Sequence, residues 1–123
     1  MNSKLIKVLT ILLALLLLVF GLNKFFGYLP APTLEGGAAE FMGALNKTGY
    51  MFPIIGIVES LAGLLLVLNK WKGFALVILA PISINIILFH LSLDLGNVGP
   101  GALIFVLNIF LLYAHKDTYK ALF

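Results

Sequence analysis

Four long apolar stretches, separated by short polar connections, dominate the chain. They cover residues 4–26, 50–68, 73–94 and 100–114. A helix over the second stretch, YMFPIIGIVESLAGLLLVL, would be roughly 28 Å long, close to the thickness of the hydrocarbon core of a bilayer. The pattern therefore predicts an all-α fold, an integral membrane four-helix bundle with up-down topology.

The connection between the first and second spans carries a helical pattern of its own. Pro30 and Pro32 end the preceding helix, and Thr33 is placed to cap a new one. Apolar residues then recur along one helical face, at Leu34, Ala38, Phe41 and Leu45. This stripe predicts a short interfacial helix between spans one and two, with an ordinary surface loop as the alternative.

Composition and charge placement support a membrane protein and set its orientation. The 123 residues are 62% hydrophobic and 11% charged, whereas soluble domains have about 25% charged residues. Most lysines lie at one end of the predicted spans, namely Lys4, Lys7, Lys70, Lys72, Lys116 and Lys120, while Lys24 and Lys47 lie at the other end. By the positive-inside rule, both termini are expected to be cytoplasmic. No linker divides the chain, so residues 1–123 are expected to form a single transmembrane domain.

Several classes of protein are excluded by what the chain lacks. It has no cysteine and no arginine, which removes disulfides, thiol chemistry and bidentate clamps for phosphate. The two histidines, His90 and His115, are predicted near opposite membrane faces, so no metal site is expected. The lysines sit at span ends rather than in a patch, so nucleic acid is not an expected partner. A cleaved signal peptide is the alternative for the first span, but the apolar run is long and no small-x-small site follows it directly.

Polar side chains occur at a similar depth in three different spans. Counted from the outer ends, Glu59, Asn85 and Asn108 lie about 12–14 Å below the outer boundary. In lipid such groups are expected to face inward and to hydrogen-bond one another. The three spans are therefore predicted to share a polar layer.

Glu59 is the most informative of these residues. A carboxylate at this depth costs about 2.5–3.5 kcal/mol on insertion scales, which makes it a functional-site hypothesis by default. Gly56, Ser60 and Gly63 cluster on one side of the same helix, and Glu59 lies within about 60° of them. We therefore expect Glu59 to border a packed interface rather than lipid. A buried carboxyl that only locks the bundle is the structural alternative.

These residues and their neighbours predict a polar cavity that opens outward. Its expected lining is Asn23, Lys24, Glu59, Asn85, His90 and Asn108. Each residue type also has a structural interpretation: a snorkelling lysine, an interfacial histidine, or asparagines that only hold helices together.

Three segments resemble the DoxX family of small four-span bacterial membrane proteins. They are GLNKFF at the end of the first span, IGIVESLAGLLLVLNKWKG in the second and ILFHLSL in the third. The most telling pieces are Gly21-x-x-Lys24-Phe25 and Glu59-x-x-x-Gly63. The resemblance implies a multi-pass protein of the bacterial cytoplasmic (inner) membrane, similar to the membrane subunit of thiosulfate:quinone oxidoreductase. It also indicates Lys24, Glu59 and His90 as site residues.

A redox-associated membrane subunit is the leading functional hypothesis. A quinone or a small sulfur-containing ligand would enter the cavity, where Asn23, Lys24, Asn85 and Asn108 would bind it. Glu59 and His90 would be the catalytic pair that passes protons. We expect no covalently bound cofactor and no self-contained catalytic motif, so any enzyme activity would be that of an oxidoreductase subunit acting with a soluble or membrane redox partner.

Two alternatives belong to other classes of protein. A small proton-coupled transporter component would use Glu59 as its coupling site, and it would need a homo-oligomer or a partner because four spans are few for alternating access. A non-catalytic membrane scaffold would recruit a partner enzyme and hold no ligand.

Overall fold

The computed structural model describes the backbone of residues 2–122 and the side chains of residues 2–119, and this part of the chain is helical without a strand. The α-helices are α1 (Ser3–Phe26), α2 (Gly36–Lys47), α3 (Met51–Val67), α4 (Lys72–Leu93) and α5 (Val98–Ala114), with 3₁₀ segments η1 (Leu95–Asn97) and η2 (Lys116–Leu122). All four predicted spans are helices, and their ends agree with the prediction to within two residues. The predicted short helix between spans one and two is also confirmed, as α2.

Local chemistry explains where α1 and α2 begin and end. The side chain of Asn2 accepts hydrogen bonds from the first backbone amides of α1, and Gly27 ends that helix in the left-handed conformation. The prediction that Thr33 caps α2 is wrong. The chain enters α2 at Gly36, whose φ of 56° favours glycine, so Thr33 lies too far upstream. Glu35 occupies the cap position and makes no side-chain capping bond.

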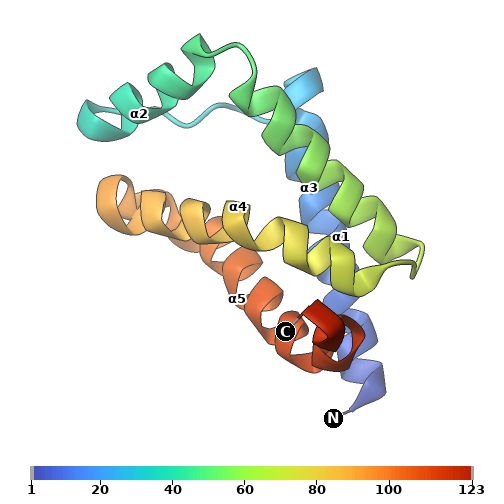
Figure 1. Ribbon diagram of the computed structural model, residues 1–123. Helices are drawn as coiled ribbons and strands as arrows, with labels where there is room; N and C mark the ends of the chain where they lie inside the picture. The colour runs from blue at the N-terminus through green and yellow to red at the C-terminus, as the bar shows by residue number, and fades with distance from the viewer. Residues whose placement is uncertain (1, 123) are drawn as a thin grey trace.

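The four long helices pack in chain order around a closed ring (Figure 1). The most extensive packing pairs α1 with α3 and α4 with α5, and smaller interfaces between α3 and α4 and between α1 and α5 complete the ring. The helices α3 and α4 diverge from the tight connection between them, and α2 lies across their far ends in contact with both (Figure 1). This divergence leaves room for a site at one end of the bundle.

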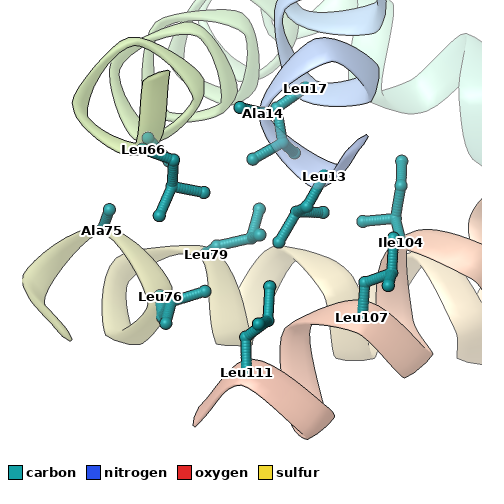
Figure 2. Close-up of a cluster of buried hydrophobic side chains, with 11 residues drawn as sticks. Leu13, Ala14, Leu17, Leu66, Ala75, Leu76, Leu79, Ile104, Leu107 and Leu111 are labelled. Carbon is teal, nitrogen blue, oxygen red and sulfur yellow. The ribbon is translucent and has the colours of Figure 1, made fainter. Parts of the chain in front are cut away.

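A leucine-rich core fills the part of the bundle nearest the α3–α4 connection (Figure 2). Its largest fully buried side chains are Leu13 and Leu17 of α1, Leu66 of α3, Leu76 and Leu79 of α4, and Leu111 of α5. Because side chains from all four long helices meet here, the core fixes their spacing. The side chains of Lys24, Glu59 and His90 lie farther from this connection, on α1, α3 and α4.

Much of the outer surface of the helices is apolar. In α1 and in α4, only 28% of the most apolar 18-residue stretch is buried inside the protein. Leucine, isoleucine and valine side chains cover the remainder, as at Val8, Leu15, Ile57, Leu88 and Val106. An aqueous solvent would leave this surface as a large exposed apolar patch, whereas lipid matches it.

Within residues 2–122, three helical segments are long and apolar enough to cross a membrane, namely α1, α4 and η1 with α5. The count rises to four if α2 and α3 are taken as one broken span, although these two helices meet at a bend of 88°. These dimensions agree with a membrane protein. They also show that α2 does not continue the direction of α3.

Candidate functional site

Glycines bring α1 and α3 unusually close together next to the candidate site. A Cβ atom added at Gly21 would lie 2.7 Å from Ser60 Oγ and 3.0 Å from Glu59 Cβ. A Cβ atom at Gly63 would lie 3.0 Å from the carbonyl oxygen of Ala14. Helices that approach this closely leave no room for lipid between them. The prediction that Glu59 borders a packed interface is therefore confirmed, and its partner is α1.

The close approach sets Glu59 against Lys24. Lys24 Nζ lies 2.6 Å from Glu59 Oε1, and the lysine reaches that position from the last turn of α1. The two partners differ in exposure, because the Glu59 side chain is 1% exposed and the Lys24 side chain 23%. A buried carboxylate is costly without a compensating cation, so Lys24 accounts for the presence of Glu59 in the bundle.

His90 is held at the end of α4 by the residues that follow it. His90 Nδ1 lies 3.3 Å from the backbone oxygen of Asp94 and 3.7 Å from its carboxylate oxygen Oδ2. The Asn97 side chain donates hydrogen bonds to both carboxylate oxygens of Asp94. The other edge of the imidazole packs on Gly101, where an added Cβ would lie 2.7 Å from Cδ2 and 3.1 Å from Nε2. Glycine at this position therefore lets α5 accept the ring.

These groups line a cavity of about 180 Å³, called here the small cavity. It lies between α1, α3, α4 and α5, and its lining is Phe20, Lys24, Glu59, Ile86, His90, Pro100, Gly101 and Ile104. The lining combines an ion pair with an imidazole, within walls that are otherwise apolar. Such a site can hold a compact polar group, donate a hydrogen bond to it from Lys24, and exchange protons through His90 or Glu59.

A second cavity of about 370 Å³, called here the large cavity, lies between α3 and α4 and is covered by α2. Phe41, Met42 and Leu45 of α2 line it, opposite side chains of α3 and α4 that include Phe52 and Phe89. The rings of Phe41 and Phe89 lie 5.5 Å apart between centroids, and Phe89 in turn packs edge-on against His90 at 5.2 Å. Phe89 of α4 therefore lies between Phe41, on the cover of the large cavity, and the imidazole that lines both cavities.

The structure brings together only part of the predicted site. Lys24, Glu59 and His90 line the small cavity. Asn85 lies on the exposed surface of α4, lines the large cavity, and donates its side-chain amide to the backbone oxygen of Pro81 in its own helix. Asn23 lines neither cavity, and its side-chain oxygen accepts a hydrogen bond from the backbone amide of Leu29.

Asn108 lies apart from both cavities, at the packed face between α4 and α5. It is fully buried, donates to the backbone oxygen of Leu76 and accepts a hydrogen bond from the Ser83 hydroxyl. The prediction that Glu59, Asn85 and Asn108 hydrogen-bond one another is wrong, because similar depth does not fix the face of a helix. Asn108 instead joins α4 to α5.

We expect Asn108→Leu to lower the free energy of unfolding by about 1–2 kcal/mol, since it removes the two hydrogen bonds by which Asn108 joins α5 to Ser83 and Leu76 of α4. Asn85→Leu is the matched control, because its amide is exposed and bonds only within its own helix. It should change stability by less than about 0.5 kcal/mol. Unfolding of the two variants in the same detergent mixture would compare them, and equal losses would contradict the assignment.

Sequence reasoning missed the partners that hold the site residues. The Lys24–Glu59 pair joins residues from different spans, and no local spacing reports it. Gly101 had a usable signal, because a glycine facing a bulky residue of a neighbouring helix marks a close approach. The large cavity had no signal in the sequence, since it depends on how far α3 and α4 diverge.

Within residues 2–119, no cluster of three or more histidine, aspartate or glutamate side chains is arranged to hold a metal ion. Comparisons with known protein families, with curated proteins and with solved structures gave no match to this chain.

Proposed function

We propose that this chain is a four-span protein of the bacterial inner membrane with both termini in the cytoplasm. The lysines Lys4, Lys7, Lys70, Lys72 and Lys116 support this orientation, since they lie at the end of the bundle away from the two cavities, while the side chain of Lys120 lies outside the described residues. The site end then faces the periplasm. The 88° bend between α2 and α3 supports a further part of the proposal, that α2 lies along the outer membrane surface.

Within this membrane protein, we propose a redox-associated subunit that binds a quinone head group in the small cavity. The observation that carries the proposal is the ion pair of Lys24 and Glu59 in one cavity with His90. Lys24 Nζ would donate a hydrogen bond to one carbonyl oxygen of the quinone. Proton donors of this kind are what quinone reduction requires, since the quinone takes up two electrons and two protons to become a quinol. The DoxX resemblance is consistent with this assignment.

The charge balance of the site favours a neutral carbonyl over a sulfur-containing anion. The Glu59 carboxylate already compensates the Lys24 ammonium at 2.6 Å. An anion placed at the same ammonium would meet the carboxylate and lose part of the attraction, whereas a neutral oxygen would not. The electrons would come from a partner redox protein, and the chain would supply binding and proton transfer.

The test is binding of decylubiquinone to the purified protein in lipid nanodiscs. The wild type should bind it, and Glu59→Gln should weaken binding by about tenfold or more, because Lys24 loses the carboxylate that orients it. Glu40→Gln is the matched control, since Glu40 lies exposed on α2 and lines neither cavity. His90→Gln provides a second variant if Glu59→Gln does not fold.

A loss of stability without any effect on ligand binding would favour the scaffold function. The Lys24–Glu59 pair is also suited to locking α1 to α3, and in that case Glu59→Gln would lower the melting temperature with no ligand affected. Absence of quinone binding by the well-folded wild type would remove the redox proposal.

A further inference from the structure

The two cavities meet at the site residues. Lys24, Ile86 and His90 line both of them. A ligand that reaches the Lys24 ammonium in the small cavity therefore has the large cavity directly beside it. The two spaces have different linings, because the small cavity holds the ion pair whereas the large one is walled mainly by phenylalanine, methionine, leucine and isoleucine side chains.

The large cavity is built between elements that are held apart. The helices α3 and α4 diverge from their connection, and α2 crosses above the gap (Figure 1). The contacts that hold α2 to α4 are the Phe41–Phe89 ring pair and the packing of Gly37 against Leu93, where an added Cβ would lie 2.9 Å from the leucine. Below these two contacts the space remains open, at about 370 Å³. That is within the usual range for small-molecule sites, about 300–1,000 Å³.

The rim of the large cavity includes residues on the outer surface of the bundle. Pro81 and Asn85 of α4 are exposed and line it, as does Phe41 of α2 at 42% exposure. The same surface of α4 continues into exposed leucine and isoleucine side chains at Ile84 and Leu88. An opening in an apolar helix surface is reached from lipid rather than from water.

We propose that the large cavity holds the hydrocarbon chain of the ligand whose polar head lies in the small cavity, and that this ligand enters sideways from the bilayer beneath α2. The proposal rests on the proposed function for the nature of the head group and adds the class of ligand. The ligand is a long-chain amphiphile dissolved in the membrane, and a small water-soluble sulfur anion does not fit this pair of cavities. Lys24 and His90, at the junction, would contact the head where the chain is attached.

The experiment compares two probes on the protein in nanodiscs, at equal concentration in the membrane phase. One is decylubiquinone, and the other is its chain-free head, dimethoxy-methylbenzoquinone. The wild type should bind the decyl compound about tenfold more tightly, which corresponds to about 1.4 kcal/mol. Leu45→Trp fills the large cavity from α2 and should reduce binding of the decyl compound to the level of the chain-free head, without changing binding of that head.

Leu15→Trp is the matched control, since Leu15 is 53% exposed on α1 and lines neither cavity. It should bind both probes as the wild type does. Equal affinity of the wild type for the two probes, or an equal effect of the two tryptophan variants, would overturn the proposal and leave the redox function standing.

A third probe separates failure of this inference from failure of the proposed function. Dodecanoate has a chain but no quinone head. Suppose that the quinones fail to bind, whereas dodecanoate binds to the wild type and not to Leu45→Trp. The site for the hydrocarbon chain is then supported and the redox function is contradicted. If no probe binds, both fall.

Discussion

Replacing Gly21 with leucine should lower the free energy of unfolding by about 3 kcal/mol, because it forces apart α1 and α3, the pair of helices with the most extensive packing. Even the first atom of the new side chain would lie 2.7 Å from Ser60 Oγ and 2.9 Å from the Ser60 backbone nitrogen. The backbone nitrogen cannot move without shifting α3. Because Lys24 and Glu59 lie across the same interface, the variant should also weaken decylubiquinone binding. Denaturation in mixed micelles, followed by circular dichroism, measures the stability.

Gly43→Leu is the matched control for this prediction. Gly43 lies inside α2, and an added Cβ there would meet no other heavy atom within 4 Å. The same change in side-chain volume should therefore cause no loss of stability, and the higher helix propensity of leucine should raise stability by up to about 1 kcal/mol. Similar losses in the two variants would show that the effect comes from leucine itself and not from the packing of α1 on α3.

Lys24→Met should destabilise the protein by about 3–5 kcal/mol, considerably more than Glu59→Leu does. The methionine variant leaves a carboxylate that is 1% exposed without its cation. The leucine variant leaves an ammonium whose side chain is 23% exposed and can turn towards water, so about 1–2 kcal/mol is expected. Both variants break the same contact, so the difference between their stability losses reflects the different burial of the charge that remains.

The double variant Lys24→Met/Glu59→Leu completes a thermodynamic cycle. With both charges removed, an apolar pair occupies the interface, and stability should return to within about 1 kcal/mol of the wild type. The cycle is measured by the same mixed-micelle denaturation as the single variants. Additive losses in the double variant would show that the two side chains act independently and that the 2.6 Å contact carries little energy.

The helices could be predicted from the sequence because lipid exposure makes their signal simple. Long apolar runs bounded by lysine, glycine or proline mark helix ends directly, and α1, α3, α4 and α5 agree with the prediction to within two residues. The face of α3 could be predicted as well, since Gly56 and Gly63 mark the side that contacts α1. Small residues at helical spacing report close packing wherever it occurs.

The composition of the site could be predicted only in part. Glu59, Lys24 and His90 were found because charged residues within apolar spans are rare and few places can hold them. The prediction that Asn85 and Asn108 hydrogen-bond with Glu59 is wrong, since counting residues along a helix gives depth but not direction. Asn85 lies on the exposed surface of α4, whereas Asn108 points from α5 towards α4, and this difference depends on how the helices rotate when they pack.

The unequal exposure of Lys24 and Glu59 makes the ion pair electrostatically asymmetric at the protein surface. The Lys24 side chain is 23% exposed whereas the Glu59 side chain is 1% exposed, so only the cation has part of its side chain at the molecular surface. A molecule that approaches the exposed part of this pair therefore meets the ammonium rather than the carboxylate, although the pair as a whole is neutral. The ammonium attracts the lone pairs of electron-rich atoms, and it repels metal cations and protonated amines.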